Sequence, residues 1–268
     1  MLLTESRNPD TMNIDKLSTV DILSTINRQD QEVPLAVADA IPQIASAVDA
    51  ITEAFNNGGR LLYVGAGTSG RLGVLDAVEC PPTYGVSSDL VVGILAGGPN
   101  TMFKSSENCE DNRSNGEQAM LDHHVCDKDV VVGLSAAGGA QYVLGAIQTA
   151  KEKGAVTVGF SCNKNSPLEQ LCDIPITVLT GPEVVTGSTR MKAGTAEKLV
   201  LNMLTTAAMI RTGKVYENLM INVQANNDKL QRRAVSIVSE ICNCDQETSR
   251  KTLESVHWNV RKAIDEIL

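Results

Sequence analysis

Five short apolar segments alternate with stretches of helical spacing along most of this 268-residue chain. The segments are rich in valine, leucine and isoleucine and are bounded by turn or charged residues, so they predict buried strands. They occupy residues 61–64, 90–95, 130–134, 157–160 and 174–178. Strands that alternate with helices imply right-handed crossovers. We therefore expect an α/β fold, a three-layer sandwich around a mostly parallel sheet.

Helical patterns fill the intervals between these segments. Residues 36–55 carry apolar side chains every three or four positions and end at an Asn-Asn-Gly-Gly stop signal. A similar pattern at 142–153 ends at Gly154. The break at Cys80-Pro81-Pro82 predicts the end of another helix just after Glu79.

The chain becomes mainly helical after about Lys198. Residues 199–211 are apolar on nearly every face, which predicts a helix buried in the core or against a second subunit. Residues 229–268 read as short amphipathic helices, so we expect a small C-terminal helical appendage. We place the domain boundary between residues 225 and 226.

Composition narrows the classes of function. The net charge of −9 argues against a nucleic-acid partner. No apolar run reaches about 18 residues and no basic-then-apolar leader is present, so we expect neither a membrane span nor secretion. The seven scattered cysteines lack zinc-site spacing and predict reduced thiols in the cytoplasm.

Residues 181–198 form a polar, glycine-punctuated turn that runs into a helix. Hydroxyl side chains and the cations of Arg190, Lys192 and Lys198 gather beside the expected helix N-terminus. Glycines let the backbone approach a ligand, and a helix N-terminus favours anions. The segment therefore predicts an anion site, with a simple capped helix start as the alternative.

A second glycine-rich loop, 65–70, follows the first predicted strand and opens a helix. Its G-x-G-x-x-G spacing is typical of a dinucleotide site. The acid at the usual distance, however, is Asp89, which precedes the second strand instead of following it. Thr68 and Ser69 place hydroxyls where a sugar or a phosphate would bind. A purely structural tight turn is the third interpretation.

Two acids stand out by their surroundings. Glu79 lies before the Cys-Pro-Pro break, and Glu110 lies in an acidic stretch after a Gly-Gly-Pro-Asn turn. Two carboxyl groups can divide acid and base roles when their environments separate their pKa values. Exposed, solvated acids are the alternative.

Six segments together resemble the N-acetylmuramic acid 6-phosphate etherase family, and the 181–198 segment also resembles the glucokinase regulatory proteins. The segments are 4–9, 17–19, 65–75, 79–85, 181–198 and 213–220. The resemblance implies a sugar isomerase-type (SIS) fold, a homodimer with sites near the subunit interface, and no metal or organic cofactor. It also implies a reaction that converts N-acetylmuramic acid 6-phosphate to N-acetylglucosamine 6-phosphate and D-lactate.

The family's site residues map onto this chain by motif. The resemblance makes Glu79 the acid for the leaving oxygen and Glu110 the base that activates water. It implies that the phosphorylated amino sugar is bound by Gly67, Thr68, Ser69, Ser135, Gly138, Glu183, Ser188, Thr189, Arg190 and Lys192.

The chain departs from the family in the loop after the third strand. Where the family usually has A-A-S-G-R-T-P-Y, residues 135–142 read S-A-A-G-G-A-Q-Y, so Ala137, Gly139 and Ala140 replace serine, arginine and threonine. The chain also ends earlier than family members usually do. Two functions follow as alternatives: a working etherase, favoured by both glutamates, or a non-catalytic sugar-phosphate sensor, favoured by the altered loop.

Overall fold

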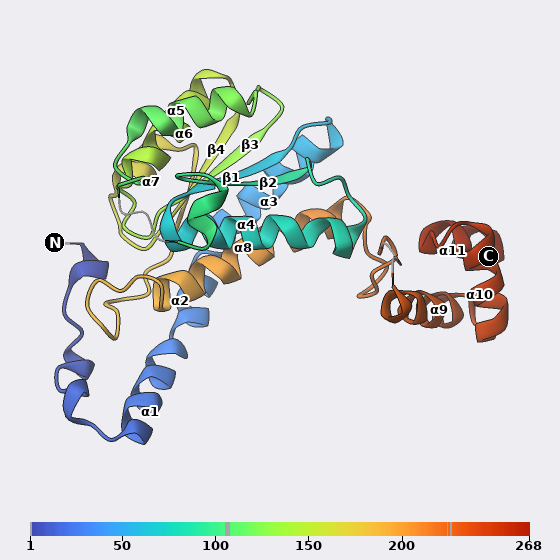
Figure 1. The fold of residues 1–268 in the computed structure, drawn as a ribbon, viewed down its shortest axis with the longest axis horizontal. Coiled ribbons are helices and arrows are strands. Elements are labelled where there is room, and N and C mark those ends of the chain that lie inside the picture. The colour runs from blue at the N-terminus through green and yellow to red at the C-terminus, as the bar shows by residue number, and fades with distance from the viewer. Residues whose placement is uncertain (1, 105–107, 224, 226) are drawn as a thin grey trace.

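The computed structural model describes residues 2–104, 108–223, 225 and 227–268. At its centre is a sheet of five parallel strands in the order β2-β1-β3-β4-β5 (Figure 1). The strands are β1 (Leu61–Gly65), β2 (Val91–Leu95), β3 (Val130–Leu134), β4 (Val156–Ser161) and β5 (Ile174–Thr177). Each strand end lies within one residue of its predicted position, which confirms the parallel α/β sheet.

Helices cover both faces of the sheet, because side chains alternate along each strand. On β1, Leu61 and Tyr63 belong to one apolar cluster, and Leu62 and Val64 belong to the other. Figure 1 shows α3, α4 and α8 below the sheet and α5, α6 and α7 above it. Their bounds are α3 (Ile41–Asn56), α4 (Gly67–Tyr84), α5 (Arg113–Asp122), α6 (Gln141–Glu152), α7 (Pro167–Leu171) and α8 (Lys192–Arg211). The predicted three-layer sandwich is confirmed.

The helix predicted over 36–55 is wrong in one respect, because it is two helices. Helix α2 (Val33–Asp39) ends at Ala40, and α3 begins at the next residue. Pro42 occupies the first turn of α3, where its missing N–H costs no hydrogen bond. The proline therefore starts a new helix and the chain changes direction before it.

Helix α4 does not end at the Cys-Pro-Pro sequence, which corrects the predicted break. Pro81 and Pro82 lie inside its last turn, and the helix ends at Gly85, whose φ of 63° suits glycine. The Gly85 N–H donates to the Pro81 carbonyl over 2.9 Å. Glu79 is consequently an exposed residue on a regular helix.

Helix α8 begins at Lys192, six residues before the predicted start of the helical region. Its apolar residues Val200, Leu204 and Ala208 are fully buried in the same cluster as residues of α3 and α4. The predicted buried helix is thus confirmed, and this subunit alone supplies its burial.

The N-terminal arm consists of short 3-10 turns and α1 (Thr19–Asp30). Thr11 Oγ1 donates to the Val184 carbonyl over 2.9 Å, and the Leu3 N–H donates to Asn163 Oδ1 over 2.6 Å. The arm is therefore tied to the segment that precedes α8 and to the loop after β4. Among the described residues no single helix has the length and apolarity to cross a membrane, whereas one bent pair, Thr19–Asp39 with Ile41–Asn56, has them.

Three amphipathic helices end the chain and lie apart from the sheet (Figure 1). They are α9 (Asp228–Cys242), α10 (Gln246–Ser255) and α11 (Val260–Ile267). They share an apolar cluster of their own, which also includes Ile221 and Val223. The helical appendage is confirmed, and the boundary at 225–226 stays a prediction.

Candidate active site

Three loops that follow parallel strands meet at the carboxyl edge of the sheet, where ligands of open α/β sheets bind. They surround a cavity of about 370 Å³, the sheet-edge pocket. Six of the twelve predicted site residues line it: Gly67, Thr68, Ser69, Glu110, Ser135 and Thr189. The other lining residues are Glu5, Ala66, Asp111, Leu134, Ala136, Ala137, Gly139, Ala140 and Gly187.

The loop after β1 brings a helix N-terminus to the pocket. Ala66 is the N-cap of α4 and has no side-chain oxygen to bind the first amides. A Cβ on Gly70 would lie 2.5 Å from the Gly65 carbonyl oxygen, so glycine is needed for this close packing of strand and helix. The first turn of α4 therefore presents amides and hydroxyls, with the positive end of the helix dipole, to a ligand.

Ser69, in this first turn, has a partner behind the pocket. Its Oγ lies 2.7 Å from Oε2 of Glu197, a buried residue of α8. Burial raises the pKa of Glu197 to about 8, and the hydrogen bond with Ser69 opposes that rise. A carboxyl group thus stands directly behind a predicted substrate-binding hydroxyl.

The loop after β3 is shaped by Ser135 and Gly138. Ser135 Oγ accepts from the Gly138 N–H over 3.0 Å, which closes the turn. Gly138 has a φ of 75°, and a Cβ there would lie 2.4 Å from the Ser166 Cβ. Gly138 itself is therefore a turn residue packed behind the pocket, while Ala137 and Ala140 face it. These positions carry hydroxyls in the family pattern, so the departure falls on the pocket wall.

Glu110 reaches the pocket from the segment before α5. Its backbone carbonyl accepts from the Tyr142 N–H of α6 over 2.9 Å. That bond fixes the main chain, while the Glu110 side chain is exposed at the pocket. A carboxylate exposed at a pocket can exchange protons with a ligand or a water molecule.

The segment before α8 was predicted to bring Glu183 and Lys192 to the substrate, but both residues are buried away from the pocket. Glu183 is fully buried, and its two oxygens accept from the Lys192 and Ala193 N–H groups over 2.9 and 3.0 Å. Lys192 is buried as well, with Nζ 3.1 Å from Gln29 Oε1. The structure therefore places Glu183 and Lys192 behind the pocket, as the internal cap of α8.

Ser188 and Arg190 flank the lining residue Thr189 but do not line the pocket themselves. Arg190 is exposed. The described lining contains three acids, Glu5, Glu110 and Asp111, and neither lysine nor arginine. An anion in this pocket would be held by amides, hydroxyls and the α4 dipole.

Glu79 is not at this pocket. It lies ten residues after Ser69 on α4, or about 15 Å along the helix axis. Its exposed neighbours Leu75 and Val78 are apolar. Within one subunit the structure therefore does not bring the two predicted catalytic glutamates together.

Three acids at or behind the pocket are absent from the predicted set: Glu5, Asp111 and Glu197. Helical spacing provides the signal for Glu197, which precedes the buried Val200 and Leu201 by one turn and so falls on the buried face of α8. A carboxyl group in that position needs a partner. Glu5 ends a three-residue 3-10 turn and Asp111 lies in the turn before α5, and segments this short give no such signal.

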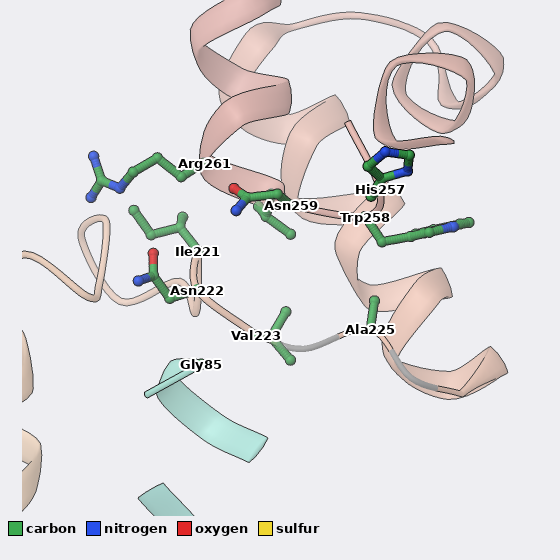
Figure 2. Close-up of a pocket in the computed structure, with 10 residues that line it drawn as sticks. Gly85, Ile221, Asn222, Val223, Ala225, His257, Trp258, Asn259 and Arg261 are labelled. Atoms are coloured by element: carbon green, nitrogen blue, oxygen red, sulfur yellow. The ribbon is translucent and has the colours of Figure 1, made fainter. Parts of the chain in front are cut away.

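A second cavity, of about 410 Å³, lies between the end of α4 and the C-terminal helices (Figure 2). Figure 2 shows Gly85 on one side and Trp258 and Asn259 on the other. It contains none of the predicted site residues, and its lining is Gly85, Ile221, Asn222, Val223, Ala225, His257, Trp258, Asn259, Val260 and Arg261.

Models of known families match most of the chain. The N-terminal SIS domain of glucokinase regulatory protein matches residues 43–151, and the SIS domain matches residues 100–207. The C-terminal lid domain of glucokinase regulatory protein matches residues 217–268. A phosphoheptose isomerase from Francisella tularensis has the same fold, with a TM-score of 0.53, 18% identity, and coverage of 72% of this chain and 98% of its own.

Curated relatives are more similar. The N-acetylmuramic acid 6-phosphate etherase of Actinobacillus pleuropneumoniae serotype 7 is 53% identical over 267 residues, which cover 100% of this chain and 88% of the relative. The protein of the same name from Aliivibrio fischeri (strain MJ11) is 56% identical over 263 residues, covering 98% of this chain and 88% of the relative. These similarities extend over the SIS fold and the helices that follow it, so the chain belongs to the N-acetylmuramic acid 6-phosphate etherase family.

Proposed function

We propose that this protein is an enzyme that cleaves the lactyl ether of N-acetylmuramic acid 6-phosphate. The products are D-lactate and N-acetylglucosamine 6-phosphate, in cell-wall amino sugar recycling. Identity of 53% along the whole chain to etherases of that name carries the proposal. The sheet-edge pocket supports it, because it combines a carboxylate, Glu110, with an open helix N-terminus and four hydroxyl side chains, those of Thr68, Ser69, Ser135 and Thr189.

In this proposal the phosphoryl group binds at the first turn of α4. The amides of 67–69 and the hydroxyls of Thr68, Ser69 and Ser135 donate to its oxygens, and the helix dipole compensates its charge. Thr189 adds a further hydroxyl at the pocket wall, whereas contacts from Ser188 and Arg190, which do not line the pocket, stay predictions. Glu183 and Lys192 support the site indirectly by fixing the start of α8.

The reaction is an elimination followed by addition of water. The aldehyde at C1 of the open-chain sugar acidifies the C2 proton, so a base can remove it. The C3–O bond then breaks, a C2=C3 double bond forms, and the lactyl ether oxygen takes a proton from an acid. Water adds at C3 and C2 regains a proton. We assign activation of water to Glu110 and protonation of the leaving oxygen to Glu79.

This assignment requires a second subunit. Glu79 lies on the outer face of α4 beside Leu75 and Val78, which are 48% and 57% exposed. Apolar side chains around an exposed acid suit a subunit interface. We propose a homodimer in which Glu79 of one subunit acts in the sheet-edge pocket of the other.

Mixed dimers test this arrangement. Glu79→Gln and Glu110→Gln should each abolish turnover. When the two variants are unfolded together and refolded, each heterodimer would have one site with both glutamates intact. Random pairing then restores about a quarter of wild-type activity. A mixture as inactive as its components would place both glutamates in a site within one subunit.

Release of D-lactate from N-acetylmuramic acid 6-phosphate, without added metal or nucleotide, tests the reaction itself. Release that disappears in Glu110→Gln is the expected result. The second candidate function is a phosphosugar sensor without catalysis, favoured by the loss of hydroxyls at Ala137 and Ala140. Binding without any release would support the sensor and contradict the enzyme.

A cytoplasmic location belongs to the same proposal. Six cysteines are free thiols in the structure: Cys80, Cys126, Cys162, Cys172, Cys242 and Cys244. Free thiols are typical of proteins in reducing compartments.

A further inference from the structure

Glu197 is a buried carboxyl group behind the sheet-edge pocket, with one oxygen on the lining residue Ser69. The residue is 1% exposed, and its Oε2 lies 2.7 Å from Ser69 Oγ. Its Oε1 is buried and has no hydrogen-bond partner among the residues that the structure describes. An ionised carboxylate in such a place would be costly, because buried charges require several donors or a cation. The surroundings therefore favour the neutral acid.

The titratable groups around Glu197 offer it no compensating cation. Cys162, the residue after β4, interacts electrostatically with Glu197, and burial raises the pKa of its thiol to about 12. Lys192, earlier on α8, directs its Nζ to Gln29, and the neighbouring Lys198 is exposed. On α4, Arg71 donates to the Thr101 carbonyl and Asp76 accepts from Asn202 of α8. The other acids are Glu183 at the start of α8 and Glu5, Glu110 and Asp111 on the pocket wall.

The proton between Glu197 and Ser69 determines what Ser69 offers to the pocket. A neutral carboxyl group can donate its proton to Ser69 Oγ, which leaves the Ser69 proton free to donate to a ligand. An ionised carboxylate instead accepts the Ser69 proton. Ser69 then presents lone pairs to the pocket, and these repel the oxygens of an anion.

We propose that Glu197 is a positioning residue, whose neutral form makes Ser69 a hydrogen-bond donor to the bound phosphoryl group and whose ionised form removes that donor. This inference rests on the proposed phosphosugar site. It matters more here than in a pocket with cations, because neither lysine nor arginine is among the described lining residues. Each hydroxyl donor then carries a larger share of the binding.

Binding of N-acetylglucosamine 6-phosphate, measured by calorimetry between pH 7 and 9.5, tests the proposal. A phosphate monoester loses its second proton near pH 6, so the ligand has constant charge over this range. A hydrogen bond to a charged group contributes about 1.5–3 kcal/mol. Because the pKa of Glu197 is about 8, about one molecule in 30 still holds the neutral acid at pH 9.5. The wild-type affinity should therefore fall by about 8- to 25-fold between pH 7 and 9.5.

Glu197→Gln keeps the neutral donor at every pH. Its affinity should stay within a few fold of the wild type at pH 7 and show no fall at higher pH. The matched control is Asp76→Asn, another buried carboxyl group with a raised pKa, which bonds Tyr63 and Asn202 and does not line the pocket. This control should keep the wild-type fall.

Two results would overturn the proposal: a wild-type affinity that is constant up to pH 9.5, or the same fall in Glu197→Gln. If Glu197→Gln does not fold, Ser69→Ala is the variant to measure. Weak binding that is constant with pH supports the proposal, and an affinity that still falls at higher pH contradicts it. D-lactate release tests the proposed function separately. A fall in affinity with pH that Glu197→Gln abolishes, without D-lactate release, would refute the etherase proposal and retain the role of Glu197. No binding at any pH would refute both.

Discussion

Helices α4 and α8 both begin near the carboxyl edge of the sheet, yet the first turn of α4 is uncapped and the first turn of α8 is capped. The start of α4 has no side-chain cap and opens into the sheet-edge pocket. The start of α8 is closed, because the buried carboxylate of Glu183 accepts from the Lys192 and Ala193 N–H groups. One helix N-terminus is thus available to a ligand, and the other already holds an internal anion.

The difference shows how an anion site is selected. Both helices have the dipole and the free amides that attract negative charge. A carboxylate from the same chain satisfies those amides at α8 and makes that helix a fixed support. At α4 the N-cap is Ala66, so an external phosphoryl group can supply the missing acceptors.

The largest expected effect is the loss of the α8 cap. Glu183→Ala leaves two helix amides without an acceptor in a buried region, so we expect a loss of about 3 kcal/mol in the free energy of unfolding. Urea denaturation measures it. Phosphosugar affinity of the folded fraction should change little. A stable variant that no longer binds phosphosugar would show that Glu183 belongs to the ligand site.

Removing a hydroxyl from each helix start compares the two directly. Ser69→Ala should weaken N-acetylglucosamine 6-phosphate binding by about 10- to 150-fold at pH 7, the loss of one hydrogen bond to a charged group. Thr195→Ala, at an exposed position in the first turn of α8, should leave binding unchanged. Calorimetry measures both variants. Equal losses would mean that the two helix N-termini share the ligand.

A cation added to the pocket should strengthen binding at α4. Gly139 lines the pocket, and no atom lies within 4 Å of a Cβ built there, so the Cβ of Gly139→Arg meets no clash. We expect about a tenfold lower Kd for the phosphosugar, or about 1.4 kcal/mol. Gly139→Gln controls for added bulk. An arginine that changes Kd no more than glutamine does would place the phosphoryl group elsewhere.

The smallest effect should come from restoring hydroxyls to the second loop. Ala137→Ser with Ala140→Thr adds two donors on the pocket wall, and we expect the Kd to fall a few fold, about 1 kcal/mol. Calorimetry on the double variant measures it. An unchanged Kd would mean that this loop does not contact the phosphoryl group.

Much of the fold could be predicted because the strands are short, apolar and separated by clear stops. Helix ends were harder to place: Pro42 starts a helix and Pro81 lies inside one, and the same residue type permits both. Local spacing does not distinguish the two cases. In the folded chain the last turn of α4 contacts α8, where Tyr84 donates to Thr206 Oγ1 over 3.3 Å.

The candidate site could be predicted in part. Thr68, Ser69 and Ser135 follow strands whose parallel order brings their loops together. The position of Lys192 could not be predicted, because its burial depends on Gln29, which is 163 residues away in the chain. A lysine in a motif typical of anion sites can therefore have a structural role instead of a role in binding.

The most direct test is the structure of the Glu110→Gln variant with N-acetylmuramic acid 6-phosphate bound. We predict that the phosphoryl oxygens lie within hydrogen-bonding distance of the amides of 67–69 and of Ser69 Oγ, with Glu183 still bound to the first amides of α8. A phosphoryl group seated on Arg190 and the N-terminus of α8, with Glu183 displaced, would contradict this arrangement.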